Sequence, residues 1–240
     1  SLMRILSIDS ASKVATAALL DENNLIAEYT LNNKMEHSTL IMDMVDKLLK
    51  DSNLSIDDID GFVVSKGPGS FTGLRIGMAT IKGLSFGSNK PYISISSLDA
   101  LAYSLISFDG IICPIMDALR DSVYTCLYKN NNGNLEKLAD YSALDLDELI
   151  EVLKEKGEKV IFTGDGLIKH KEYLSTNLPN VYFAPNHLSI IRASSLGDLG
   201  VKLLLDNVSD ELNSSPFYLK KPQAQRELEK RLALENENKL

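Results

Sequence analysis

The chain has 240 residues, of which 44% are hydrophobic and 24% charged, and its formal net charge is −8. This length fits one large domain or two small ones, and the apolar content argues against a disordered chain. No apolar run approaches the roughly 20 residues of a membrane span, and we expect no secretory leader. The longest basic cluster is Lys220–Lys221, so the sequence predicts no extended basic surface that would bind nucleic acid.

The two cysteines, Cys113 and Cys126, lie in apolar runs. We expect buried thiols in a reducing compartment rather than a disulfide or a metal site. This favours a cytoplasmic protein without membrane attachment.

The first half of the chain alternates between strand and helix patterns. Three apolar runs separated by turn residues predict a three-stranded meander over Arg4–Asp9, Val14–Leu20 and Leu25–Leu31. Helical periodicity follows over His37–Lys50. Two strand–helix units complete this half, with strands at Gly61–Ser65 and Pro91–Ile95 and helices at Thr72–Gly87 and Leu98–Ile106.

The second half repeats the first. A strand over Ile111–Met116 reaches Asp117 and is followed by a strand over Ser122–Tyr128, as the first strand reaches Asp9 before the second. The segments Val63–Gly69 and Val160–Gly166 also correspond, each being an apolar strand that ends in a Gly-x-Gly turn. Such internal repetition predicts an α/β, duplicated ribonuclease H-like fold, that of actin-like ATPases (ASKHA), with two lobes of mixed sheets.

We place the boundary between the lobes near Phe108–Gly110. The expected lobes cover 3–108 and 109–222, and the charged tail 223–240 follows them as a solvated or frayed helix.

Asp9-Ser10-Ala11-Ser12 is the first candidate for chemistry. A strand that ends in Asp before a hydroxyl-rich hairpin can hold phosphate and order a metal through the carboxylate. The matching hairpin, Asp117-Ala118-Leu119-Arg120, lacks the glycine that close backbone approach favours. The two hairpins are therefore either a vestigial nucleotide cleft or inherited turns that only cap strands. The residues concerned are Asp9, Ser10, Ser12 and Asp117.

The segment Gly67-Pro68-Gly69-Ser70-Phe71-Thr72-Gly73 fits neither a Walker loop nor a dinucleotide fingerprint. Ser70 or Thr72 can cap the following helix, where an anion could bind, or the segment is only a tight turn. Gly73, Gly77 and Gly83 then lie inside a helix, at about 1 kcal/mol each relative to Ala. One face of this helix carries Gly73, Ile76, Gly77 and Thr80. Its small side chains allow close packing either on the chain's own sheet or against a helix of another chain.

The helix His37–Lys50 carries more apolar surface than one core requires. Its apolar side chains span an arc of about 200°, whereas a helix on a single core needs roughly 100°. The surplus either lies beneath a loop or the tail of the same chain or binds another chain. We expect an intermolecular surface made of Leu40, Ile41, Met44, Val45 and Leu48 from this helix and Gly73, Ile76, Gly77 and Thr80 from the next one.

No residue of the chain is predicted to be catalytic or to bind a metal. A helical metal site would place a second ligand four residues from His37, but Asn33 and Ile41 occupy those positions. His170 and His187 have no partner at ligand spacing, and no Gly-x-Ser-x-Gly motif occurs.

Several segments together resemble the TsaB (YeaZ) family. The most specific is Lys66-Gly67-Pro68-Gly69-Ser70-Phe71-Thr72-Gly73-Leu74-Arg75-Ile76-Gly77. The others are Ile5–Ala11, Glu36–Ser38, Lys82–Leu84, Met116–Arg120 and Tyr218–Lys220. The resemblance covers the chain from Met3 to about Pro222.

The resemblance implies a non-catalytic paralogue of TsaD, the subunit that transfers threonylcarbamoyl to the adenosine beside the anticodon of tRNA. TsaD carries a His-x-x-x-His metal site that this sequence lacks. The family pairs with TsaD through the two helices that match His37–Lys50 and Thr72–Gly87, forms homodimers through the same surface in isolation, and works with the ATPase TsaE. The resemblance also implies that this chain needs no cofactor of its own and that ATP and magnesium belong to the partner subunits. It further implies that the chain contacts tRNA only through the complex.

The competing hypothesis is an enzyme that acts alone, an actin-like ATPase or small-molecule kinase. Asp9 and Asp117 would then hold magnesium and position phosphate. Binding of ATP with magnesium would distinguish this enzyme from a scaffold.

Overall fold

The computed structural model describes residues 2–33, 37–211 and 234. The segment Tyr218–Lys220 and, apart from residue 234, the expected tail 223–240 lie outside the described residues. None of the helices in the described part is long and apolar enough to cross a bilayer. Two compact units are present: the described residues up to Ile106 together with those from Pro185 to Glu211 form the first unit, and Ser107–Ala184 forms the second.

The first unit is built on a five-stranded mixed sheet. Its strands lie in the order β3–β2–β1–β4–β5, with bounds β1 (Arg4–Asp9), β2 (Val14–Asp21), β3 (Leu25–Asn32), β4 (Gly61–Ser65) and β5 (Tyr92–Ile95). β1, β2 and β3 form the expected antiparallel meander, whereas β4 runs parallel to β1 and β5 parallel to β4. Asp9 therefore ends β1 at the edge of the sheet where the parallel strand β4 also ends.

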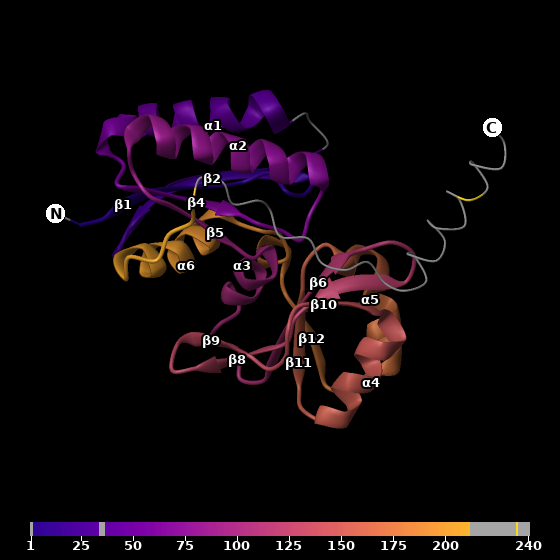
Figure 1. The fold of residues 1–240 in the computed structure, drawn as a ribbon. Helices are drawn as coiled ribbons and strands as arrows, with labels where there is room; N and C mark the ends of the chain where they lie inside the picture. Colours follow the sequence, from indigo (N-terminus) through magenta and orange to yellow (C-terminus); the bar gives the residue numbers. More distant parts are fainter. Residues whose placement is uncertain (1, 34–36, 212–233, 235–240) are drawn as a thin grey trace. The chain divides into compact units, whose positions relative to one another are not determined.

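Helices cover both faces of this sheet (Figure 1). α1 (His37–Asp51) and α2 (Phe71–Ser88) lie on one face, and α3 (Ser97–Tyr103) and α6 (Ala193–Leu205) on the other. The two predicted helices that match the family's pairing helices are thus confirmed. Each of their ends lies within two residues of its predicted position. Short 3₁₀ turns occur at η1 (Ile56–Asp58) and η2 (Asn186–Leu188). The main core lies between the sheet and the pair α1–α2 and includes Leu6, Ile8, Phe62 and Met78.

The second unit repeats this plan. Its sheet has the order β10–β7–β6–β11–β12, from β6 (Ile111–Asp117), β7 (Ser122–Thr125), β10 (Ser142–Asp145), β11 (Val160–Thr163) and β12 (Val181–Phe183). β6 takes the place of β1, and β7, β10, β11 and β12 follow as β2, β3, β4 and β5 do in the first sheet. α4 (Leu146–Lys156) and α5 (Gly166–Asn177) pack on the core of this unit. The predicted duplication is therefore confirmed.

One predicted strand of the second unit is broken. The expected strand over Ser122–Tyr128 ends at Thr125, and a separate hairpin of β8 (Tyr128–Asn131) and β9 (Asn134–Lys137) follows. β7 pairs with the end of β6, whereas Tyr128 of β8 pairs with Ile112 near its start. The residues Cys126 and Leu127 between them are buried but outside both ladders.

The expected range 109–222 for the second lobe is wrong after Ala184. The chain returns to the first unit, where α6 packs against β1, β2, β4 and β5. Two glycines allow the close approach: a Cβ on Gly197 would lie 2.6 Å from Leu20 Cδ2, and one on Gly200 would lie 2.4 Å from Val63 Cγ2. The helix therefore completes the first core from a position late in the sequence.

A buried carboxylate fastens the start of α6 to β3. Glu28 Oε1 accepts a hydrogen bond from Arg192 Nε at 2.9 Å and pairs with Arg192 Nη2, and Glu28 Oε2 accepts one from the backbone N–H of Ser194 at 2.7 Å. The backbone N–H of Ala193 donates to Thr16 Oγ1 at 3.0 Å. These acceptors satisfy N–H groups of the first helical turn, for which the residue at the N-cap provides no side-chain bond.

We expect Glu28→Ala to lower the free energy of unfolding by about 2 kcal/mol, because it removes charge-assisted hydrogen bonds from a nearly buried site. Urea denaturation measures this effect. Glu151→Ala, which breaks an exposed pair with Lys154, is the control and should change stability little. Equal effects of the two substitutions would show that Glu28 does not anchor α6.

Candidate functional site

The carboxylate of Asp9 is wholly buried at the end of β1. Its Oδ1 accepts a hydrogen bond from the backbone N–H of Ala11 at 2.8 Å, but its Oδ2 has no hydrogen-bond partner among the described residues. Burial raises the pKa of Asp9 to about 6, and the backbone N–H groups of Ala11 and Ser10 oppose that rise. The hairpin thus holds a carboxylate with one uncommitted oxygen atom.

The same hairpin packs directly against the start of α2. Ser10 Oγ donates to the carbonyl of Gly73 at 2.8 Å, and the backbone N–H of Ser70 donates to the carbonyl of Ala11 at 2.6 Å. Ser12 Oγ accepts from the N–H of Val14 at 3.1 Å and helps to close the hairpin. The structure therefore brings Asp9, Ser10 and Ser12 together, but it commits the Ser10 hydroxyl to the chain's own helix.

Asp117 occupies the corresponding position in the second unit, at the end of β6. Its backbone N–H donates to Asp165 Oδ1 at 2.8 Å, and its carboxylate Oδ1 lies 3.6 Å from His170 Nε2. His170 is buried, and its Nε2 has no hydrogen-bond partner among the described residues. Sequence reasoning identified Asp117 but missed His170, which lies one turn of α5 beyond the Gly164-Asp165-Gly166 turn.

The surroundings of the two aspartates differ in charge and exposure. Asp9 is buried, whereas the side chain of Asp117 is 42% exposed. Among the described residues, no group of three or more His, Cys, Asp or Glu side chains has the arrangement of a metal site. Asp9 and Asp117 belong to different units.

The predicted partner-binding residues of α1 are largely core residues. Ile41, Met44, Val45 and Leu48 are buried against the first sheet, and Leu40 is half-buried against the same cluster. The expectation that these side chains face another chain is therefore contradicted for the four buried ones. Apart from Met42, the described part of the apolar arc of α1 is covered at least in part by the chain's own sheet and by α2, which packs beside it.

The predicted glycine face of α2 also points inward. A Cβ on Gly73 would lie 2.0 Å from the carbonyl oxygen of Ser10, and one on Gly77 would lie 3.0 Å from Ser10 Oγ. Ile76 and Thr80 are half-buried, and Thr80 Oγ1 donates to the carbonyl of Ile76 at 2.8 Å. Gly73 and Gly77 thus serve close packing on the hairpin, which was the alternative explanation, and they are not available to a partner.

A different face of α2 is exposed. Ala79, Gly83 and Gly87 recur at four-residue spacing, all exposed, and a Cβ on either glycine would meet nothing within 4 Å. The ring of Phe86 is 76% exposed and that of Phe71 is 56% exposed. Arg75 completes this outer face of α2, with its guanidinium 4.3 Å from the centre of the Phe71 ring. We define the outer face of α2 as Phe71, Arg75, Ala79, Gly83, Phe86 and Gly87.

The sequence contained the signal for this face. The spacing Ala79, Gly83, Gly87 is as regular as Gly73, Gly77, but only the packed structure shows which of the two stripes the hairpin covers. On α1, which lies on the same face of the sheet as α2, the side chain of Met42 is also exposed.

Known proteins with similar sequences identify the family. A family model described as "TsaD: tRNA N6-adenosine threonylcarbamoyltransferase" matches residues 24–234. The "tRNA threonylcarbamoyladenosine biosynthesis protein TsaB" of Bacillus subtilis (strain 168) is 41% identical over 172 residues, which are 72% of this chain and 75% of that protein. The chain belongs to the TsaB family.

Other relatives agree with this assignment. TsaB of Escherichia coli (strain K12) is 33% identical over 135 residues, which are 55% of this chain and 58% of that protein. Among solved structures, YeaZ from Pseudomonas aeruginosa superposes with a TM-score of 0.75 at 20% identity, covering 91% of this chain and 100% of that one. At that identity the superposition shows the fold alone, and it confirms the predicted actin-like α/β fold of this TsaB-family chain.

The buried Asp9 predicts a specific pH dependence of stability. Its pKa of about 6 in the folded state exceeds the ordinary value of 3.8 for an exposed aspartate, so the folded state binds more protons between these values. The resulting stabilisation is complete below pH 4 and is lost as the pH rises through 6, to a total of about 3 kcal/mol. We expect Asp9→Asn to remove this part of the pH profile, as measured by urea denaturation from pH 4 to 7.

Asp57→Asn, at an exposed carboxylate of η1, is the matched control and should keep the profile of the unmodified chain. If Asp9→Asn also keeps it, Asp9 does not titrate in the buried state described here.

Proposed function

We propose that this chain is the non-catalytic, activating subunit of the machinery that forms threonylcarbamoyladenosine in tRNA. It binds TsaD, the threonylcarbamoyltransferase, so that TsaD can act on the adenosine beside the anticodon, and TsaE completes the assembly. In isolation the chain pairs with a second copy through the same surface. Membership of the TsaB family supports the pathway, and the surface of the first unit supports the role of a binding subunit.

The outer face of α2 is the observation that carries this proposal. Phe71 and Phe86 expose large rings on one side of a helix. Large aromatic side chains are the most common anchors of protein interfaces, and in isolation they expose apolar area to water. Between them, Ala79 and Gly83 leave the helix backbone bare, and Gly87 extends this bare stretch beyond Phe86. A partner helix can therefore approach closely between two anchoring rings.

The hairpin of the first unit makes this face rigid. Hydrogen bonds from Ser10 and to Ala11 hold the first turn of α2, and Ser70 Oγ caps the helix by accepting from the N–H of Gly73 at 3.0 Å. A surface that is ordered before binding loses less entropy on association. The proposed partner surface thus moves from the buried Gly73 and Gly77 to the exposed side of α2. Its neighbour is α1.

The histidine content supports a non-catalytic role. The chain's three histidines are His37, His170 and His187, so it has no His-x-x-x-His pair. We propose that the chain needs no cofactor of its own, that ATP and magnesium act in the partner subunits, and that a chain of net charge −8 meets tRNA only through the complex in the cytoplasm.

One observation favours a second candidate, an actin-like ATPase or small-molecule kinase. The uncommitted Oδ2 of Asp9 lies in the hairpin where such enzymes position phosphate and magnesium. Calorimetry with ATP and magnesium separates the two functions: tight binding with turnover by the chain alone would replace the first proposal. Under the first proposal, the chain restores transfer only when TsaD, TsaE and the threonylcarbamoyl adenylate are present.

We expect Phe86→Ala to weaken association with TsaD at least about tenfold, because it removes an anchoring ring from the outer face of α2. Since the ring is exposed, the free energy of unfolding should change little. Native mass measurement of the complex and the rate of threonylcarbamoyl transfer give the two readouts. Ile168→Ala removes a side chain that is 89% exposed on α5 of the second unit and serves as the control. If both variants bind TsaD equally well, the outer face of α2 is not the interface.

We expect Gly83→Leu to separate stability from binding. Because a Cβ at this position meets nothing within 4 Å, leucine fits the isolated chain and should raise the free energy of unfolding by about 0.5–1 kcal/mol. The same side chain should prevent close approach of a partner helix and abolish the complex. Ser175→Leu, an exposed position of α5, controls for an added surface leucine. A stabilised Gly83→Leu chain that still binds TsaD normally would contradict the proposed contact.

A further inference from the structure

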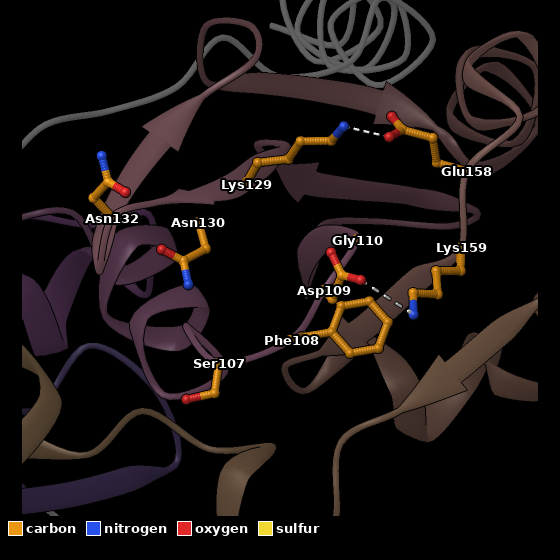
Figure 2. A pocket seen from close by; sticks show the side chains of 9 residues that line it. All are labelled: Ser107, Phe108, Asp109, Gly110, Lys129, Asn130, Asn132, Glu158 and Lys159. Carbon is orange, nitrogen blue, oxygen red and sulfur yellow. Dashed lines mark hydrogen bonds and ion pairs between the residues drawn. The ribbon is translucent and has the colours of Figure 1, made fainter.

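A cavity of about 550 Å³ lies within the second unit, between three segments that are distant in sequence. It is lined by Ser107–Gly110 before β6, by Lys129, Asn130 and Asn132 of the β8–β9 hairpin, and by Glu158 and Lys159 before β11. Figure 2 shows the Lys129–Glu158 pair on one side of the opening and the Phe108 ring with Lys159 and Asp109 on another. Its volume is within the range of roughly 300–1,000 Å³ that is typical of small-molecule sites.

This cavity is separate from the candidate hairpins. Gly110 precedes the first residue of β6, whereas Asp117 is the last. The length of that strand, roughly 20 Å, therefore separates the cavity from Asp117. A ligand here would not occupy the position at which actin-like enzymes hold phosphate.

The charges of the lining cancel in pairs. Lys129 forms an ion pair with Glu158, and Lys159 Nζ lies 3.8 Å from Asp109 Oδ2. Two ammonium groups and two carboxylates give the lining no net charge. A polyanion such as a nucleoside triphosphate would meet both carboxylates, and a divalent cation would meet both ammonium groups. The lining therefore favours a ligand that is uncharged but rich in hydrogen-bonding groups.

One flat apolar surface stands among these polar groups. The rings of Phe108 and Tyr182 form an edge-to-face pair with centres 5.5 Å apart, and Lys159 Nζ lies over the Phe108 ring, 5.6 Å from its centre. A ring held in this way is a stacking platform, and a cation near the ring adds attraction for a stacked π-system.

Asn130 and Asn132 of the β8–β9 hairpin line the same cavity, on a different side from Phe108 (Figure 2). Asn130 Oδ1 accepts from the N–H of Gly133 at 2.6 Å, which fixes the orientation of its amide. A side-chain amide offers a donor and an acceptor side by side, and this pair matches the N6 and N7 edge of adenine. Stacking surface, amides and zero net charge occur together in this cavity.

We propose that this cavity binds an uncharged planar nucleobase with its sugar, stacked on Phe108 and hydrogen-bonded by Asn130 and Asn132. The base comes from a free nucleoside, because the phosphates of an RNA strand would meet the two carboxylates of the lining. This binding is independent of the partner surface on α2, which lies in the other unit.

Titration of the full-length chain with adenosine tests the proposal, followed by calorimetry and by backbone amide shifts in NMR. We expect saturable binding, with shifts concentrated at 107–110, 129–132 and 158–159. A single-stranded hexaadenylate is the charged comparison: we expect weaker binding per adenine than for adenosine, and equal or tighter binding would overturn the neutral site. If adenosine and hexaadenylate both fail to shift these residues, the proposal is wrong.

Phe108→Leu should weaken adenosine binding about tenfold or more, because it removes the stacking ring while keeping an apolar side chain. Tyr141→Leu is the matched control: this ring also has a lysine over it, Lys137 Nζ at 4.1 Å, and it lies in the same unit outside the cavity. Thermal unfolding of each variant confirms that it is folded. Equal affinity of the Phe108 and Tyr141 variants for adenosine would overturn the stacking geometry.

Glu158→Gln provides a second test that does not depend on the ring. It leaves Lys129 without its anionic partner and gives the lining one net positive charge. The unmodified chain should bind AMP no more tightly than adenosine, whereas Glu158→Gln should prefer AMP. An unmodified chain that already prefers AMP strongly would show that the cavity does not behave as a neutral site.

Discussion

The contact between the β1–β2 hairpin and the first turn of α2 is the constraint on which the first unit depends. The carbonyl oxygens of Ser10 and Ala11 lie against the backbone of that turn, so close that a Cβ on Gly73 would lie 2.0 Å from one of them. The hydrogen bonds from Ser10 Oγ and to Ala11 follow from this approach. Once α2 is fixed in this way, Gly73 and Gly77 must face inward and Phe86 must face solvent.

This contact links the two functional hypotheses. The hydroxyl of Ser10 and the carbonyl of Ala11, which line a phosphate-type hairpin, are used to hold α2. What remains for a ligand is the buried Asp9 with its single uncommitted oxygen. An ionised carboxylate in that position costs stability at neutral pH. The hairpin thus serves the binding surface on α2 more directly than it serves nucleotide chemistry.

The sequence was sufficient for most of the elements but not for their partners. Periodicity and turn residues located α1, α2, the strands of the first sheet and the strands β6 and β11 of the second, and the repeat of Asp9 in Asp117 indicated the duplication. It could not place α6, because the glycines and Glu28 that dock this helix on the first sheet form contacts between residues more than 130 positions apart. It also misassigned Ile41, Met44, Val45 and Leu48, since an apolar arc does not reveal what covers it.

By itself, the sequence determined the family, the duplicated plan and the two helices that matter, because a motif as specific as Gly67–Gly77 and a regular hydrophobic period are local properties. The tertiary structure decided which side of α2 is free, where the chain returns to the first unit, and that His170 lies beside Asp117. It also brought Phe108, Asn130 and Lys159 to one cavity. These facts depend on which surfaces remain in contact with water after packing, and burial is a property of the folded chain rather than of any segment.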